Sequence, residues 1–171
     1  LGRFIATKHW YDDPSDPFKR GPSFMTFDRE RNAVVLQDQR VWMAGLSDEG
    51  GAGAWLALVM KQLGAPNASE IEKFERFVTQ TLDGRLQVNQ GPEKFGVRKS
   101  LFYYEPQAPQ GVRYDPAIDW TKWSAWRKSQ ADSVVRSFNY VHVAAAHWVL
   151  YRLARYQDGL VKAHDWRWYL D

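Results

Sequence analysis

The feature that most constrains the fold of this chain is the stretch from Tyr140 to Tyr156, which is apolar on nearly every side. Wound as a helix, it keeps few polar positions, because its apolar side chains include Val141, Ala144, Ala145, Trp148, Tyr151 and Leu153. A helix that is apolar all round is normally buried. The pattern therefore predicts a central helix over residues 140–156 that other elements must cover.

Two more helices are predicted earlier in the chain. Residues 47–63 run mostly apolar and end at Gly64, close to Pro66, which is typical of a helix end. Ser69 and Glu72 match a capping box, and apolar residues then recur at three- and four-residue steps up to Leu82. We therefore expect a mostly apolar helix over 47–63 and an amphipathic helix over 69–82.

The remaining segments contain more breakers. Residues 1–35 hold many turn-forming residues, with one predicted short strand at Ala33–Leu36. Residues 84–118 are rich in Gly and Pro and are predicted to form a long connection. A further helix is predicted over residues 120–130. The last residues, His164–Asp171, resemble the first turn of another helix. The chain is thus expected to comprise a loop-rich N-terminal segment, 1–35, and a helical domain, 36–171.

Alternating buried and half-exposed helices are typical of a toroid of helical hairpins, in which outer helices shelter inner ones. An ordinary helical bundle predicts much the same pattern. Both interpretations place the chain in the all-α class.

Composition excludes several functions. The 171 residues suit one domain, the net charge is only +3, and no run of five like charges occurs, which disfavours nucleic acid as a partner. There is no cysteine, and no apolar stretch is long enough to cross a membrane. Sequence signatures of phosphate loops, zinc proteases and α/β-hydrolases are missing, so no cofactor is expected. The 9 Trp, 8 Tyr and 9 Phe exceed what a core of this size needs, which leaves rings for a ligand.

Two stretches carry a resemblance to a known family. Residues 40–53 read Arg-Val-Trp-Met-Ala-Gly-Leu-Ser-Asp-Glu-Gly-Gly-Ala-Gly, and residues 136–148 read Arg-Ser-Phe-Asn-Tyr-Val-His-Val-Ala-Ala-Ala-His-Trp. Both are similar to segments of a bacterial and fungal family with a six-hairpin, (α/α)6 glycosidase-like domain. The resemblance implies that the chain is part of an (α/α)6 toroid from a larger, secreted or periplasmic protein. It also implies a carbohydrate substrate, and that the missing polypeptide would cover apolar surface through which the fragment could otherwise self-associate.

Glycoside hydrolysis in most families needs two carboxyl groups at the scissile bond. Asp48 and Glu49 are catalytic candidates, because the starts of inner helices in such a toroid border the central funnel. Adjacent residues on a helix diverge, so at most one of the two faces the substrate. The alternative is that both only complement the helix dipole.

The start of the helix over 140–156 supplies binding candidates. Asn139, Tyr140 and His142 combine hydrogen-bonding groups with a ring, as a pyranose requires, and Trp42 lies in the other family-like stretch. Each of these residues could instead be structural. The five-residue spacing of His142 and His147 places them on different helix faces and argues against a shared metal.

The long loop supplies the last candidates. Tyr103 and Tyr104 could form a sugar subsite at the rim of the funnel, and Glu105 is a third carboxylate that could take part in catalysis. The alternative is that these rings anchor the loop. Trp120, Trp123 and Trp126 share helical spacing and are predicted to pack.

Three functions remain open at this stage. The first is a glycoside hydrolase, or less readily a lyase, acting on a poly- or oligosaccharide. The second is a non-catalytic module that binds glycans or a protein. The third is a structural subdomain of a larger protein.

Overall fold

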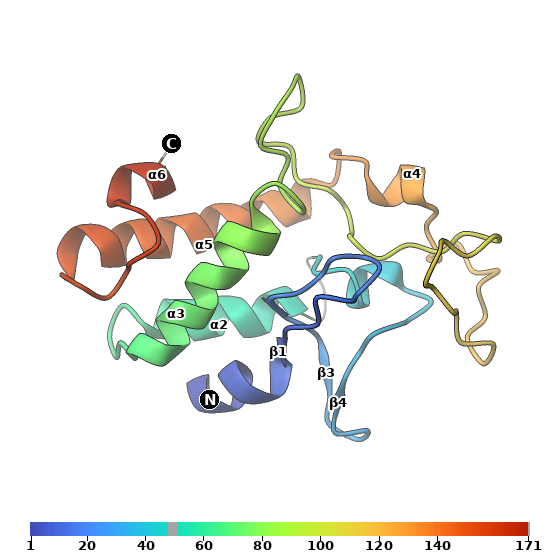
Figure 1. The fold of residues 1–171 in the computed structure, drawn as a ribbon, viewed down its shortest axis with the longest axis horizontal. Coiled ribbons are helices and arrows are strands. Elements are labelled where there is room, and N and C mark those ends of the chain that lie inside the picture. The colour runs from blue at the N-terminus through green and yellow to red at the C-terminus, as the bar shows by residue number, and fades with distance from the viewer. Residues whose placement is uncertain (48–50, 171) are drawn as a thin grey trace.

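The computed structural model describes residues 1–47 and 51–170 of the chain (Figure 1). About 40% of the chain is helical, and the described residues also form two antiparallel sheets of two strands each. The α-helices are α1 (Gly2–Phe4), α2 (Gly53–Lys61), α3 (Ala68–Phe77), α4 (Lys128–Ala131), α5 (Ser137–Tyr156) and α6 (Trp166–Leu170). The strands are β1 (Trp10–Tyr11), β2 (Ser23–Phe24), β3 (Phe27–Asp28) and β4 (Ala33–Val34).

This mixed architecture shows that the prediction of an all-α (α/α)6 toroid is wrong. Only α2, α3 and α5 among the described helices are longer than five residues. Much of the described chain between them packs as turns and short strands, because closely spaced Gly and Pro residues stop helices from extending. None of the described helices is long and apolar enough to span a membrane.

The N-terminal segment is more regular than its sequence suggested. Residues 2–9 form α1 and a π-helical turn, and Ile5 and Ala6 are buried in the main core. The first cluster of helix-disfavouring residues begins only at Asp12, so the preceding residues can form helical turns. β1 then pairs with β2, and the strand predicted at 33–36 is β4, paired with β3.

Helix α3 follows its predicted pattern, with a different cap. The Asn67 side chain accepts the backbone N–H of Glu70, so the helix begins two residues earlier than the capping box at Ser69 would place it. A π-helical turn over Val78–Leu82 continues it to the predicted end. The face carrying Phe74 is buried, as the three- and four-residue spacing predicted.

Helix α5 is buried on one face only, so the prediction that it is covered all round is wrong. Val149 and Leu153 pack into the core, whereas Phe138 and Val141 are 65% exposed and Trp148 is 44% exposed. α2 and α5 run in the same direction, with their first residues toward the same end of the molecule (Figure 1). Ser47 Oγ donates to Asn139 Oδ1 at 2.9 Å, which ties the chain before α2 to the start of α5.

A second, smaller core lies at the other end of the molecule. It consists of Val41, Trp42, Ala44, Phe102 and Trp126. The helix predicted over 120–130 is reduced to α4, since the preceding residues form turns that bring Trp126 to 4.8 Å from Trp42, centroid to centroid. Trp126 is buried in this core and Trp120 packs against it, whereas Trp123 is 79% exposed, so the prediction that all three Trp residues pack on one helix is wrong for Trp123 and for the helix.

A buried ion pair joins the N-terminal segment to this region. Arg20 Nη2 lies 2.9 Å from Asp16 Oδ1, and both side chains are at most 4% exposed. Arg20 also donates to the carbonyls of Leu36, at 2.7 Å, and Ala44, at 2.9 Å. The guanidinium thus links the carboxylate of Asp16 to two other stretches of backbone.

Candidate functional site

A large pocket lies against α5. It measures about 1150 Å³ and is bounded by α5, by the loop over residues 83–97 and by α6. In Figure 1 this loop and α6 stand on the same side of α5. We call it the α5 pocket, and its lining residues are Met60, Asp83, Gln87, Val88, Asn89, Lys94, Phe95, Val97, Tyr140, Val143, Ala144, Ala145, His147, Trp148, Tyr151, Trp168, Tyr169 and Leu170.

The floor of the pocket follows from the spacing of residues on α5. Tyr140, His147 and Tyr151 recur at intervals of seven and four, so they share one helix face. Between them, Ala144 and Ala145 carry only methyl groups. Small side chains flanked by rings leave room for a ligand along the wall that α5 provides.

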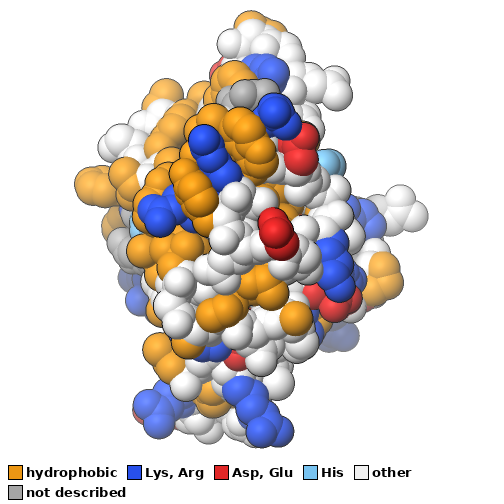
Figure 2. Space-filling model, turned by 90° about the vertical axis from the view of Figure 1, so that its left-hand side faces the viewer, with side chains coloured by type: hydrophobic (Ala, Val, Ile, Leu, Met, Phe, Trp, Pro, Cys, Tyr) orange, Lys and Arg blue, Asp and Glu red, His pale blue; other side chains and the backbone are white. Residues whose placement is uncertain are grey.

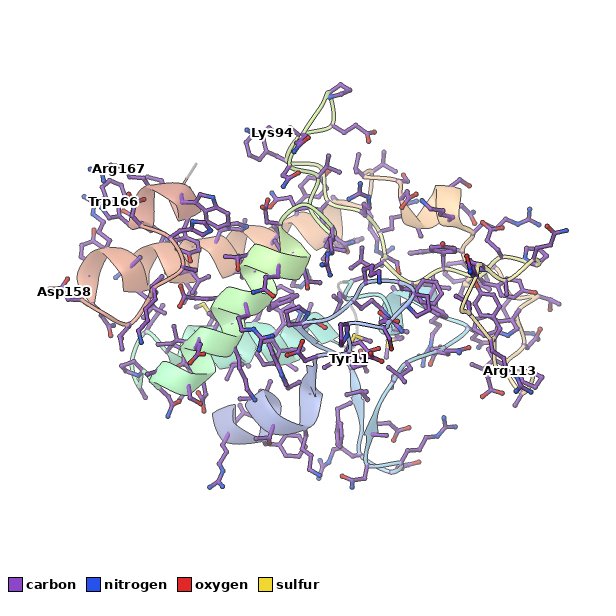
Figure 3. All side chains as sticks on the ribbon, in the orientation of Figure 1. Tyr11, Lys94, Arg113, Asp158, Trp166 and Arg167 are labelled. Atoms are coloured by element: carbon purple, nitrogen blue, oxygen red, sulfur yellow. The ribbon has the colours of Figure 1, made fainter. Side chains whose placement is uncertain are left out.

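The loop wall is held by its own backbone. Phe95 N–H donates to Val88 O at 2.7 Å, and Val88 N–H donates to Gly96 O at 2.8 Å, so the loop folds back on itself. A Cβ at Gly96 would lie 2.9 Å from a methyl group of Val134, which explains the glycine there. Lys94 lies on this loop, away from the helices (Figure 3).

The third wall, α6, is fastened by a buried carboxylate on α3. Glu75 Oε1 accepts the backbone N–H groups of Lys162, at 2.9 Å, and Ala163, at 2.8 Å, together with the hydroxyl of Tyr169, at 3.2 Å. Burial, followed by the negative charge of Glu75, raises the pKa of Tyr169. The Tyr169 hydroxyl therefore stays protonated and donates to Glu75. This hydrogen bond holds α6 in place as a wall of the pocket.

Removing this carboxylate should loosen the α6 wall. Glu75→Ala is expected to lower the free energy of unfolding by about 3 kcal/mol, because one buried and two partly buried donors lose a charged acceptor. Urea denaturation measures the loss, and amide hydrogen exchange at Lys162 and Ala163 should accelerate more than elsewhere. Glu72→Ala, on the exposed side of α3, is the matched control, and an equal effect there would contradict the assignment.

His147 provides the most unusual polar atom in the pocket wall. Its Nε2 is buried and has no hydrogen-bond partner among the described residues. Burial lowers the pKa of His147, and the negative charge of Asp83 offsets part of that effect. A neutral imidazole with one unpaired nitrogen can exchange a hydrogen bond with a bound ligand.

The lowered pKa gives stability a defined pH dependence. Below the unfolded-state pKa of about 6.5, the unfolded chain binds a proton that folded His147 does not, so stability should fall between pH 7 and pH 5. His147→Phe keeps a ring but cannot be protonated. As the pH falls from 7 to 5, the melting temperature of the wild type should therefore decrease more than that of the variant. A difference independent of pH would contradict the burial of His147 in its neutral form.

The predicted site residues are divided between two regions. Tyr140 lines the α5 pocket, and its hydroxyl donates to Val134 O at 2.6 Å. Asn139 is buried and structural, since its amide donates to Arg98 O at 2.8 Å and Lys99 O at 3.2 Å. His142 is not among the lining residues and packs edge-on to Trp55.

The other candidates lie in the second core or beside it. Trp42 is buried there, while Tyr104 stacks on Trp120 with centroids 4.9 Å apart. Tyr103 packs edge-on to Phe18, and Glu105 accepts the backbone N–H of Lys128 at 3.0 Å. None of these four candidates lines the α5 pocket. Asp48 and Glu49 lie outside the described residues, so their predicted approach to Asn139, Tyr140 or His142 stays a prediction.

Sequence reasoning missed most of the pocket wall. The seven-residue step from Tyr140 to His147 could have placed His147 beside Tyr140, because that step returns to the same helix face. Asp83 and Asn89 had no such signal, since they lie in a loop without periodicity. No group of three or more His, Asp and Glu residues arranged to hold a metal ion is found in the part of the chain that the structure describes.

The arrangement combines aromatic rings with hydrogen-bonding groups from three elements. Comparison with known proteins adds neither a fold nor an activity, since no curated protein and no solved structure matches the chain. The resemblance to six-hairpin glycosidases thus stays a prediction. One family model does match, over all of residues 1–171, and the chain belongs to that family of unknown function, DUF5695.

Proposed function

We propose that the α5 pocket binds a carbohydrate, and that the protein is the sugar-binding part of a carbohydrate-processing system. The observation that carries the proposal is the mixed chemistry of the wall. Tyr140, Trp148, Tyr151 and Trp168 offer ring faces, on which the C–H face of a pyranose can pack. Asp83, Asn89 and the unpaired nitrogen of His147 offer partners for hydroxyl groups.

The size of the pocket supports an oligosaccharide over a single sugar. Small-molecule sites usually measure about 300–1,000 Å³, and the α5 pocket exceeds that range. The extra room suits a ligand of two or more rings.

The test is titration of the intact protein with neutral oligosaccharides of glucose, xylose, mannose and N-acetylglucosamine, by calorimetry and saturation-transfer NMR. At least one should bind, with saturation strongest at ring C–H protons. Trp148→Ala should weaken that binding by about tenfold or more, because a stacking face is lost. Trp123→Ala, which removes a 79% exposed ring outside the pocket, is the control. Failure of every sugar to bind the folded protein would overturn the proposal.

Glycoside hydrolysis is the second candidate. It is favoured by Asp83 acting electrostatically on neutral His147 inside one pocket, because both groups can accept a proton. Asp83 is, however, the only carboxylate among the described lining residues, and most glycosidases use two. If turnover exists, Asp83→Asn should abolish it while leaving oligosaccharide binding within about threefold of wild type.

A further inference from the structure

One wall of the α5 pocket continues outward as a surface of arginines and aromatic rings. It runs along the last turns of α5 and onto α6, at the end of the molecule that Figure 2 faces, where basic and hydrophobic side chains intermingle. Trp166 and Arg167 mark its α6 side in Figure 3. We call it the arginine–aromatic face, and it consists of Trp148, Tyr151, Arg152, Arg155, Tyr156, Trp166 and Arg167.

The arginines of this face are stacked on the rings. The guanidinium carbon of Arg152 lies 5.3 Å from the ring centroid of Trp148 and 5.4 Å from that of Tyr156. That of Arg155 lies 4.7 Å from the ring centroid of Trp166. Such contacts hold each guanidinium against a ring and so limit the conformational freedom that a bound anion would otherwise have to remove.

Among the residues that the structure describes, most N–H groups of the Arg152 and Arg155 guanidinium groups have no hydrogen-bond acceptor. Arg155 donates one of them to the hydroxyl of Tyr151, at 2.7 Å. Among the described residues, neither Arg152 nor Arg155 is paired with a carboxylate, whereas Arg167 lies 3.6 Å from Asp165 at an exposed position. The guanidinium groups of Arg152 and Arg155 are held in place and have no acidic partner among the described residues. Each is suited to a carboxylate group, which a guanidinium can bind through two parallel hydrogen bonds.

The local charge is also unbalanced. Helix α5 contains no acidic residue, and residues 148–170 contain four basic side chains and two acidic ones. Trp148 and Tyr151 belong both to the α5 pocket and to the arginine–aromatic face, so the pocket and the arginines form one continuous surface. If the uncharged rings of a ligand fill the pocket, the part of that ligand that extends out of the pocket would contact Arg152 and Arg155.

We propose that the ligand is an acidic oligosaccharide, in which uronate carboxylates bind Arg152 and Arg155 while ring faces pack on Trp148 and Tyr151. This inference rests on the proposed function. Exposed rings with arginines can also bind single-stranded nucleic acid, but such proteins present a basic groove that follows the backbone. Here two arginines, neither of them paired with a carboxylate among the described residues, stand at one edge of a recessed pocket, which favours the sugar.

The experiment compares each acid with its own methyl ester. Trimers of galacturonate, mannuronate and glucuronate, and their methyl-esterified forms, would be titrated against the intact protein at about 50 mM salt. At least one acid should bind about tenfold more tightly than its ester, because the rings are the same and only the charge differs. The preference should shrink at about 500 mM salt, where exposed charges are screened.

Variants then assign the preference to the arginines. Arg152→Gln combined with Arg155→Gln should reduce acid binding to the level at which the same variant binds the ester. Arg29→Gln combined with Arg31→Gln makes the same change in net charge near the β3–β4 turn and should have no effect. Trp148→Ala should weaken acid and ester alike.

Each other outcome overturns a distinct claim. If acid and ester bind equally, the acidic-ligand inference fails while the proposed function stands. If neither forms a complex and neutral sugars also fail, the proposed function fails with it. If a thymidine decamer binds more tightly than every acid and loses affinity in the arginine variant, the face binds nucleic acid and the inference is wrong.

Discussion

Replacing Arg20 with leucine is expected to lower the free energy of unfolding by about 3–5 kcal/mol, measured by urea denaturation. The substitution leaves the carboxylate of Asp16 buried without its cation, and removing one partner of a buried pair has a cost of this size. It also leaves the carbonyls of Leu36 and Ala44 without their donor. Arg20→Lys should recover only part of the loss, because one ammonium cannot span all these acceptors.

The control is Arg31→Leu, whose partner Asp28 is 3.6 Å away and whose own side chain is 84% exposed. It should change stability by less than about 0.5 kcal/mol. Burial raises the pKa of Asp16, but the hydrogen bonds and charge of Arg20 outweigh this and the pKa is lowered. The pair should therefore stabilise the fold above pH 4 and lose this contribution below it. A loss of under 1 kcal/mol in Arg20→Leu would show that the pair is dispensable.

Trp55→Ala is expected to destabilise the protein by a similar amount, about 3–5 kcal/mol. Trp55 is 1% exposed, and its ring meets Phe77 at 5.4 Å and Phe74 at 6.2 Å, so alanine would leave a cavity in the main core. Thermal and urea denaturation measure the loss. In Trp55→Phe the cost should be smaller, because that change also removes the indole N–H, which is buried and has no hydrogen-bond partner among the described residues.

Trp123→Ala provides the comparison for Trp55, because it is the same substitution at a ring that is 79% exposed. Its expected effect is below about 1 kcal/mol. If the two substitutions were equally destabilising, Trp55 would not be the central ring of the main core.

The sequence predicted those helices whose pattern is local. α3 was found because Phe74, Val78 and Leu82 repeat at helical steps and the turn before them carries cap-forming residues. α5 was predicted because its sequence is apolar on nearly every side, but its exposed side was not predicted, because an apolar sequence does not show whether anything covers each face. The overall class was misjudged because short strands and packed turns, such as those around Trp126, depend on distant partners.

The candidate site shows the same limit. Tyr140 could be selected because it opens a helix and combines a ring with a hydroxyl group. Asp83 could not, since its position beside His147 results from how the loop packs on α5. The prediction for Asp48 and Glu49 depends on their position at a helix start in a toroid, and the correction of the fold removes that support.

The attachment of α6 to Glu75 also determines how this chain must fold. The three bonds to Glu75 join residues that are 87, 88 and 94 positions apart. Contacts of such long separation must overcome a large loop-closure entropy, and proteins that depend on them fold slowly. On the ribosome, Glu75 would emerge well before its partners and would wait unpaired for several seconds at ordinary rates of synthesis. The α5 pocket is therefore a late product of folding, completed only after the residues of α6 have been made.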